Sequence, residues 1–496
     1  MDRTPAPPRG VSLSQILSDA SLPSGDITVS SCCADSRACR PGDLFVALPG
    51  SAADGHNHVN QAVERGATAI LAGRPLGECP VPVCYVDDVA RAFGEVCHAL
   101  AGNPARRLKT IGITGTNGKT TTSYLIGSVL SAAGQKTGVL GTLGYFDGQE
   151  WADAGWTTPP ANVMAQWMAR MVANGCTHAV MEVSSHALAQ QRLAGVDLDV
   201  ACLTNVRRDH LDYHGTWGAY RDTKARLFDR LAPEGFAVVN VDDPAAESLL
   251  ARVDGPVLSV GINAPAEVTA VPVEQFASEQ TFLLSAGEET IAVRTPLIGA
   301  HNITNCLMAA AVGLVYSIDL PTIVAGLEAI PRVPGRLERI ECGQPFSVFV
   351  DYAHTPDALS ASLTTLRAVT RGRLICVFGA GGDRDKSKRG PMGRAVEEVA
   401  DVAVVTSDNP RGERPAAIIE QIVAGCAEPS AVRTIVDRHE AIVWALEQAQ
   451  PGDCVLLAGK GHETYQMIGD RRFHFDDREV ARNWLYEMAP ALGRAA

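Results

Sequence analysis

The chain has 496 residues, of which 46% are apolar and 20% charged, a globular composition with material for about three domains. Its formal net charge of −13 excludes a nucleic-acid-binding protein that depends on a general basic surface. A polyanionic small molecule can bind only where basic side chains and backbone amides are concentrated locally.

The chain begins with MDRTPAPPRG, which lacks the charged-then-apolar order of a signal peptide. Residues 1–107 then carry short strands such as GDLFVALPG and ATAILAG, and we expect them to form a first domain. Residues 108–335 alternate strand-like TIGITG, THAVMEVSS, VDLDVACLTNV and GFAVVNVDD with helical patterns such as NVMAQWMARMVANG. Residues 336–496 show the same alternation of strands and helices, with strand-like segments SVFVDYA, RLICVFGA, DVAVVTS and DCVLLAG.

This alternation predicts an α/β protein of three domains. A mostly parallel central sheet is expected between an α/β N-terminal domain and a Rossmann-like C-terminal domain. The segment 331–340, with two prolines and a glycine, is predicted to be a linker. Since ligands of open α/β sheets bind beyond the carboxyl ends of the strands, the loops at those ends are the candidate sites.

The thirteen cysteines contain no C-x-x-C pair, and most lie in apolar segments. This usage argues against a zinc site and favours reduced thiols in a cytoplasmic protein. No apolar run approaches the ~20 residues of a membrane helix, so we expect no membrane insertion.

The segment GITGTNGKTTT has the context of a phosphate-binding loop, because it follows a predicted strand and precedes a helical run. Gly115 and Gly118 allow backbone amides to face phosphates, Lys119 can reach the β and γ oxygens, and the Thr120 hydroxyl can bind Mg²⁺. Ile113 stands where the usual G-x4-G-K-[ST] pattern has its first glycine, so this P-loop is a variant. The pattern predicts a nucleoside triphosphate in the central domain.

The variant TGTNGKT resembles the loop of the Mur ligase family, ATP-dependent enzymes that build the peptidoglycan stem peptide. Further matches follow in order along nearly the whole chain: DSR, GDLFVALPG, TTP, EVSSHALAQQR, NVRRDHLDYH, YRDTKARLF, HNITN, PGRLE, DYAHTPDAL and GGDRDKSKR. The resemblance implies that ATP phosphorylates a carboxylate and that an incoming amine attacks the acyl phosphate. The resemblance is strongest to the branch of the family that adds meso-2,6-diaminopimelate to UDP-N-acetylmuramoyl-L-alanyl-D-glutamate. We expect the protein to be a monomer.

The resemblance assigns catalysis to Lys119, Glu182, His210 and Lys224. It also implies two Mg²⁺ ions, held by Thr120, Glu182, His210 and by Lys224 after CO2 has converted that lysine to a carbamate. On the residues alone, a single Glu or His at a strand end is more often an ordinary surface or satisfied residue. A lysine in an amphipathic helix such as WGAYRDTKARLFDRL is usually solvated.

The nucleotide and the UDP-linked substrate are given contacts by the same resemblance. The ATP contacts are Gly115, Thr116, Asn117, Gly118, Lys119, Thr120, Thr121, Asn302, Asn305, Arg336 and Asp351, with His354 as a weaker candidate. The UDP-substrate contacts are Ser36, Thr157, Thr158, Ser184, Gln190 and Arg192. The two asparagines could equally cap a helix. Because Arg336 and Asp351 belong to the linker and third domain, the site would be complete only when that domain closes and excludes water.

The stretch VVTSDNPRGE places an acid, an amide, a proline and an arginine directly after a predicted buried strand. It reads either as a solvated turn or as a clamp with charges of both signs for a zwitterionic ligand. The resemblance favours the clamp, in which Arg411 holds the distal carboxylate of diaminopimelate and Asp408 its ammonium. The implied diaminopimelate contacts are Arg384, Asp408, Asn409, Pro410, Arg411, Gly459 and Glu463.

Several other functions compete with this interpretation. A lysine-adding ligase of the same family is the nearest, although lysine would leave Arg411 unpaired. Folylpolyglutamate synthase shares the phosphate loop but is disfavoured by the DSR and GDLFVALPG segments. A catalytically silent nucleotide-binding protein is disfavoured because the charged site positions are all intact. The serines of EVSSH lack the glycines of a hydrolase nucleophile elbow.

Overall fold

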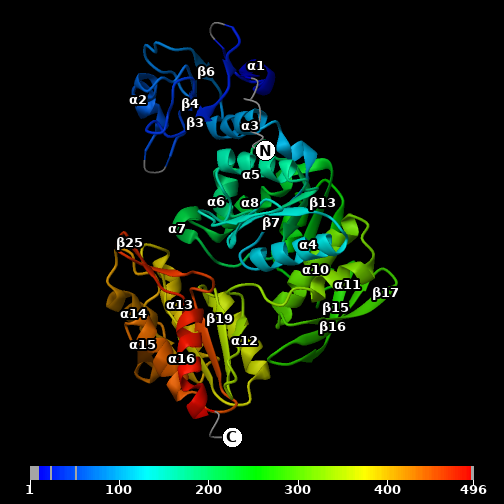
Figure 1. The fold of residues 1–496 in the computed structure, drawn as a ribbon, viewed down its shortest axis with the longest axis vertical. Coiled ribbons are helices and arrows are strands. Elements are labelled where there is room, and N and C mark those ends of the chain that lie inside the picture. Colours follow the sequence, from blue (N-terminus) through cyan, green and yellow to red (C-terminus); the bar gives the residue numbers. More distant parts are fainter. Residues whose placement is uncertain (1–9, 23–24, 51–52, 493–496) are drawn as a thin grey trace.

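Three larger β-sheets, each built from its own stretch of chain, organise the fold along the long axis of the molecule (Figure 1). The structure is a computed structural model that describes residues 10–22, 25–50 and 53–492. The opening segment that argues against a signal peptide lies almost entirely outside these residues. None of the helices within the described ranges has the length and apolar character needed to cross a membrane.

The N-terminal sheet has four parallel strands in sequence order. They are β3 (Cys32–Cys33), β4 (Leu44–Val46), β5 (Ala69–Ala72) and β6 (Val83–Tyr85). Successive residues of β4 point to opposite faces, so Leu44 packs in the core under α3 (Val89–Leu100) and Phe45 in the core under α2 (Val59–Glu64). A short pair, β1 (Val11–Ser12) and β2 (Thr28–Val29), lies beside α1 (Leu13–Ile16).

The central sheet has eleven strands in the order β10-β9-β8-β11-β7-β12-β13-β14-β15-β16-β17. The strands from β8 to β15 in this order run parallel, and the strands at both edges run antiparallel. Their bounds are β7 (Lys109–Thr114), β8 (Thr137–Gly141), β9 (Gly144–Phe146), β10 (Trp151–Ala152), β11 (His178–Glu182), β12 (Leu198–Leu203), β13 (Leu231–Asn240), β14 (Val257–Gly261), β15 (Val268–Gln275), β16 (Gln280–Ala286) and β17 (Glu289–Thr295).

Helices cover both faces of this sheet, as the alternation of strand-like and helical segments in the sequence predicts. One apolar core joins it to α4 (Lys119–Ala132), α10 (Ala300–Val315) and α11 (Leu320–Glu328). The opposite core joins it to α5 (Ala161–Ala173), α6 (Ser185–Ala189), α8 (Trp217–Ala225) and α9 (Ala246–Leu250). Since both faces are buried, the loops at the strand ends are left to carry chemistry.

The third sheet has the order β18-β19-β23-β20-β21-β22, and only β18 runs antiparallel. Its strands are β18 (Glu338–Ile340), β19 (Ser347–Asp351), β20 (Leu374–Phe378), β21 (Val402–Val405), β22 (Arg433–Thr434) and β23 (Cys454–Ala458). One face is covered by α12 (Pro356–Val369), α13 (Arg389–Glu397) and α14 (Pro415–Val423), the other by α15 (Arg438–Gln448) and α16 (Asp477–Leu492). A hairpin of β24 (Tyr465–Ile468) and β25 (Arg471–His474) follows β23.

The linker predicted over 331–340 is wrong at its C-terminal end. Its last three residues form the edge strand β18, which pairs Glu338 with Val350 and Ile340 with Val348. Ile340 is almost fully buried in the third domain, and this burial supports an extended strand once the prolines have been passed. Residues 331–337 therefore lead directly into a strand of the third sheet, and the connection between the two domains ends before Glu338.

Candidate active site

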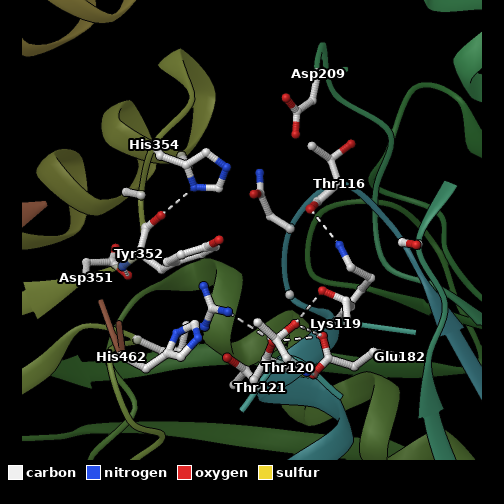
Figure 2. A pocket seen from close by; sticks show the side chains of 18 of the residues that line it. Thr116, Lys119, Thr120, Thr121, Glu182, Asp209, Asp351, Tyr352, His354 and His462 are labelled. Carbon is white, nitrogen blue, oxygen red and sulfur yellow. Dashed lines mark hydrogen bonds between the residues drawn. The ribbon is translucent and has the colours of Figure 1, made fainter. Parts of the chain in front are cut away.

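A single cavity of about 1280 Å³ lies between the central and third domains. It is lined by loops that follow the carboxyl ends of β7, β11 and β12 on one side and of β19, β20, β21 and β23 on the other. Figure 2 shows Lys119, Thr120 and Glu182 from the central domain facing Tyr352 and His354 from the third. Two parallel sheets thus present their ligand-binding edges to one space.

Most of the predicted site residues line this cavity. They are Thr116, Asn117, Gly118, Lys119, Thr120, Thr121, Thr157, Thr158, Glu182, Ser184, Arg192, His210, Asn302, Asn305, Arg336, Asp351, His354, Arg384, Asp408, Asn409, Arg411, Gly459 and Glu463. The structure places five others off the cavity wall: Ser36, Gly115, Gln190, Lys224 and Pro410. Of these five, only Ser36 lies in the N-terminal domain, where its hydroxyl donates to Gln61 Oε1 at 2.7 Å.

The phosphate loop has a backbone that only glycine permits at two positions. Gly115 and Gly118 have φ values of 154° and 87°, and a Cβ atom would lie 1.9 Å from Thr204 Oγ1 and 2.5 Å from Asn305 Oδ1, respectively. The following helix, α4, begins at Lys119, so its first amides point toward the cavity with the positive end of the helix dipole. This geometry suits an anionic phosphate group.

Lys119 folds back over its own loop. Its Nζ donates to the carbonyl oxygens of Gly115 at 2.7 Å and Thr116 at 2.9 Å. Burial lowers the pKa of this ammonium from its usual value, and the charge of Glu182 opposes that shift. A desolvated cation held at the start of a helix is positioned to interact with anionic oxygen in the cavity.

Glu182, the last residue of β11, is the centre of a compact polar cluster and is almost fully buried. The Thr120 hydroxyl donates to Oε2 at 2.9 Å, while Thr142 donates from its amide to Oε1 at 2.8 Å and from its hydroxyl to Oε2 at 3.0 Å. Arg336 donates to the Thr120 hydroxyl at 3.0 Å. The structure therefore joins the third domain directly to the phosphate loop, and Thr142 is a member that no sequence motif indicated.

Lys224 is buried, with 1% of its surface exposed, which rules out the solvated surface lysine that its helix pattern left open. Its Nζ donates to the same Gly115 carbonyl oxygen at 2.8 Å and lies 4.6 Å from the ring centre of Tyr220. Burial lowers its pKa well below the usual value, and the charge of Lys119 adds to the shift. A neutral amine is therefore accessible at this position.

His210 lies at the mouth of this cluster with a left-handed backbone, φ 53°. Its ring contacts the edge of the His186 ring, and its Nε2 lies 3.4 Å from Asp209 Oδ2. Burial lowers the pKa of His210 to about 3, although Asp209 acts in the opposite direction. The neutral imidazole can serve as a metal ligand. Asp209 also faces the cavity, near His354 of the third domain (Figure 2).

Asn302 and Asn305 lie on α10, and neither caps it, because the cap residue is Gly299. Asn305 Nδ2 donates to Asn302 Oδ1 at 3.1 Å, and Asn305 Oδ1 accepts from the Thr122 hydroxyl at 3.2 Å. The structure therefore excludes the alternative that these asparagines are N-caps. They fix α10 to α4 beside the phosphate loop.

The donor-substrate candidates on the central domain are tied together near Glu182. The Thr158 hydroxyl donates to the Glu182 carbonyl at 2.8 Å, and the Ser184 amide donates to that hydroxyl at 3.0 Å. Arg192 Nη1 donates to the Thr158 carbonyl at 2.6 Å, and its Nη2 donates to Gln190 Oε1 at 2.7 Å. Gln190 thus orients Arg192 from outside the cavity.

The stretch from Asp408 to Arg411 is not a solvated turn. Asp408 and Asn409 are buried, and Arg411 has a left-handed φ of 49° that turns its side chain along the cavity wall, where Nη1 donates to the Gly382 carbonyl at 2.9 Å. One carboxylate oxygen of Asp408, Oδ2, is buried without a hydrogen-bond partner among the described residues. Charges of both signs therefore border the same end of the cavity.

Lys460 is the most informative residue that sequence reasoning missed. It is fully buried, and its ammonium lies 3.3 Å from both Asn409 Oδ1 and Glu463 Oε2. The Asn409 side-chain amide donates to the same Glu463 oxygen at 2.8 Å. The sequence GKGHE contains this lysine, but only the fold shows that its charge lies behind the Asp408 motif rather than in solvent.

Comparisons with known proteins agree with this architecture. Three family models match the chain: the Mur ligase family catalytic domain over 28–99, the Mur ligase middle domain over 113–313 and the Mur ligase glutamate ligase domain over 335–461. The UDP-N-acetylmuramoyl-L-alanyl-D-glutamate–2,6-diaminopimelate ligase of Geobacillus thermodenitrificans is 46% identical over 90% of this chain and 93% of its own length.

Solved structures give the same result. A structure of a UDP-N-acetylmuramoyl-L-alanyl-D-glutamate–2,6-diaminopimelate ligase is 33% identical, with a TM-score of 0.69 over 97% of this chain and 99% of that chain. The MurF ligase of Thermotoga maritima in complex with ADP shares the fold, with 20% identity and a TM-score of 0.63 over 94% of this chain and 98% of that one.

Proposed function

The chain belongs to the Mur ligase family, and we propose that it joins meso-2,6-diaminopimelate to the D-glutamate carboxylate of UDP-N-acetylmuramoyl-L-alanyl-D-glutamate with ATP as co-substrate. This reaction is a cytoplasmic step of peptidoglycan precursor synthesis. The observation that carries the proposal is that one cavity contains both a phosphate loop and the motif from Asp408 to Arg411.

Donor activation would take place on the central-domain wall. The γ-phosphoryl group of ATP passes to the D-glutamate carboxylate, giving an acyl phosphate and ADP. Lys119 and the first amides of α4 stabilise the transferring group, and Arg336 reaches it from the third domain. The amine of the acceptor then attacks the acyl carbon, and the collapse of the tetrahedral intermediate releases phosphate and leaves the new amide.

The residues around Glu182 fit a magnesium site, because a buried carboxylate and the Thr120 hydroxyl supply the oxygen ligands that this ion prefers. His210 would complete the set, and Lys224 as a carbamate would help to hold a second ion. Bound Mg²⁺ would offset the repulsion between the nucleotide and the substrate carboxylate. Thr142 holds Glu182 in place by donating to both of its oxygens.

Carbamylation of Lys224 is supported by its burial and lowered pKa. The neutral amine adds to CO2, a proton leaves to solvent, and the product is an anionic N-carboxylate. The remaining N–H can still donate to the Gly115 carbonyl, so the modification need not break the contact seen in the structure. The change replaces a buried neutral amine with an anion that a metal ion can offset.

Diaminopimelate differs from lysine by a carboxylate beside its distal ammonium. Arg411 would hold that carboxylate through its guanidinium, and the unpartnered oxygen of Asp408 would accept from the ammonium. Asn409 and Glu463 would supply further polar contacts, and Arg384 would add a second cation at the cavity wall. Pro410 and Gly459 shape the backbone around them. Lysine offers Arg411 no partner, which disfavours the lysine-adding alternative.

The UDP-linked substrate would extend from the cavity toward the N-terminal domain. Thr157, Thr158, Ser184 and Arg192 would hold its sugar and peptide, and Ser36 would contact the uridine end. We assign 1–107 to UDP-substrate binding, 108–335 to ATP binding and 336–496 to the amino acid, in a monomeric enzyme.

Turnover with purified chain tests this function directly. UDP-N-acetylmuramoyl-L-alanyl-D-glutamate, ATP and Mg²⁺ are supplied with either diaminopimelate or lysine, and ADP, phosphate and the mass of the product are measured. We expect equimolar ADP and amide product with diaminopimelate and much slower turnover with lysine. ADP release without amide formation, or no turnover with either amino acid, would reject the proposal and favour a silent nucleotide-binding protein.

A further inference from the structure

Two thiols and a carboxylate lie close together in the N-terminal domain. They do not line the active-site cavity and have no role in the proposed reaction. Cys33 ends β3, Asp43 immediately precedes β4, and Cys39 lies in the loop between them. One sulfur from each cysteine and one carboxylate oxygen all lie within 4.8 Å of one another. We propose that Cys33, Cys39 and Asp43 form a binding site for a thiophilic divalent cation such as Zn²⁺.

The geometry is close to that of a zinc site. A tetrahedral ion with Zn–S bonds of about 2.3 Å holds two sulfurs about 3.8 Å apart. The two sulfurs therefore need to approach by no more than about 1 Å, and each sulfur and the carboxylate oxygen by no more than about 1.3 Å. β3 and β4 pair directly, with Cys33 opposite Phe45, so the two ends of the loop are already fixed at neighbouring points of the sheet.

The charge of Asp43 is the second, independent observation. Only 7% of its surface is exposed, and its hydrogen bonds come from the Ser31 hydroxyl and the Arg40 amide, both neutral donors. Among the ion pairs of residues 10–22, 25–50 and 53–492, none involves Asp43. Buried charges in proteins are normally paired or bound to a metal ion, and a cation between Asp43 and the two sulfurs would supply the missing partner.

The ligand types select the ion. Thiolate sulfur favours zinc over magnesium or calcium, and the added carboxylate oxygen favours zinc over monovalent copper. Cys33 is half-buried rather than enclosed, so solvent has a path to the site and water can occupy a fourth position. Binding converts two S–H groups to thiolates, and their two protons pass to the buffer. The sequence argument against zinc did not cover this cluster, because its ligands are six and four residues apart, without a C-x-x-C pair.

Such an ion would clamp the loop that carries Ser36. At present this loop is held by the ion pair Arg37–Asp35 within it and by the hydrogen bond from Ser36 to Gln61 on α2. Ordering it before ligand binding would reduce the entropy cost of docking the UDP-linked substrate. This consequence rests on the proposed function, whereas the metal site itself does not.

The test uses reduced, chelator-treated full-length chain titrated with Co²⁺ and then with Zn²⁺. We expect a sulfur-to-cobalt charge-transfer band that saturates at one ion per chain and is abolished by Zn²⁺. Cys33→Ser and Cys39→Ser should lose the band and weaken zinc binding at least about tenfold. Cys97→Ser is the matched control and should behave as the unaltered chain, because Cys97 faces Cys32 on the other face of β3 at 3.5 Å.

Alkylation mapped by mass spectrometry gives a readout that needs no variant. Zn²⁺ should protect Cys33 from iodoacetamide without protecting Cys79, which has a similar partial exposure. Absence of the cobalt band, a band retained in both serine variants, or equal protection of Cys33 and Cys79 would overturn the site. These measurements involve no turnover, so they fail or succeed independently of the ligase reaction.

The effect of the ion on the loop that carries Ser36 is tested separately by turnover. With zinc bound, the KM for the UDP-linked substrate should fall about twofold to fivefold.

Discussion

The two walls of the active-site cavity differ in how far the chain satisfies its own polar groups. On the central-domain wall, Glu182, Thr120 and Lys119 all have hydrogen-bond partners inside the protein. On the third-domain wall, one oxygen of the buried Asp408 has no partner among the described residues. The side chains of the first wall therefore hold one another in position before any ligand binds. The second retains a buried polar group that no described protein group satisfies.

This contrast suggests a division of labour. Groups that must stabilise the same phosphoryl transfer for every turnover gain from being held rigidly in advance. Groups that must recognise one amino acid gain from leaving a charge unpaired, because the wrong ligand then fails to satisfy it. The variants below test whether the two walls behave differently, beginning with the largest expected effect.

Lys119→Ala removes the central cation of the first wall. We expect kcat to fall by about 10³-fold, since the loss of one preorganised group that stabilises transition-state charge costs that much. Lys109→Ala is the control, because Lys109 begins β7, the strand that leads into the phosphate loop, is exposed and pairs with Asp199. A kcat for Lys119→Ala within about tenfold of the unaltered enzyme would show that this wall does not drive phosphoryl transfer.

Lys224→Met should separate stability from activity. Folding lowers the pKa of Lys224, so the folded chain binds fewer protons there than the unfolded chain. The resulting penalty is largest below the lowered pKa, is still present at neutral pH, and disappears only as the pH rises toward the usual lysine value. In CO2-free buffer at pH 7 we expect a gain of about 1 kcal/mol in unfolding free energy, with kcat reduced about 10²-fold.

Unfolding followed from pH 7 to pH 10 checks the sign of this effect. The stability advantage of Lys224→Met should shrink as the pH increases, because the lysine of the unaltered chain then folds without losing a proton. An advantage that grows with pH, or a variant that retains full activity, would contradict the assignment of a buried neutral amine at Lys224.

Lys460→Met tests the support behind the second wall. Its ammonium contacts Asn409 and Glu463 without lining the cavity. Its removal leaves the Glu463 carboxylate facing the like charge of Asp408 without this cation. We expect the KM for diaminopimelate to increase about tenfold, a typical loss for a residue that orients a binding group, with the KM for ATP unchanged. Equal increases for both substrates would indicate a general loss of structure instead.

Gln190→Ala should have the smallest effect. The side-chain oxygen of Gln190 accepts from the guanidinium of Arg192 outside the cavity, and Arg192 keeps its hydrogen bond to the Thr158 carbonyl when Gln190 is truncated. We expect about a threefold increase in the KM for the UDP-linked substrate, from the loss of one hydrogen bond of about 0.5–1 kcal/mol, and no change for diaminopimelate. Arg192→Ala, measured in parallel, should cost clearly more.

The sequence predicts those parts of this molecule that depend on local patterns. The phosphate loop and the strands around it are in the expected places, since a strand, two glycines, a lysine and a helix are contiguous in the chain. The charged motif after β21 is also local. Burial of Lys224 is not local, because the surface of an amphipathic helix looks the same whether water or a neighbouring loop covers it.

Contacts between distant segments account for what the sequence did not reveal. Thr142 meets Glu182 across neighbouring strands, and Lys460 reaches Asn409 from a loop fifty-one residues away. The Cys33, Cys39 and Asp43 cluster follows from the pairing of β3 with β4 rather than from a spacing motif. The linker prediction failed because burial of Ile340 outweighed the local signals of proline and glycine.

The most direct test of acceptor selection is Arg411→Ala assayed with meso-diaminopimelate and with L-lysine. Arg414→Ala is the control, because Arg414 is exposed and lies three residues further on, off the cavity wall. We predict that kcat/KM for diaminopimelate falls at least about 10²-fold, while the low rate with lysine changes less than about threefold. An unchanged rate with diaminopimelate would contradict the claim that this guanidinium selects the acceptor.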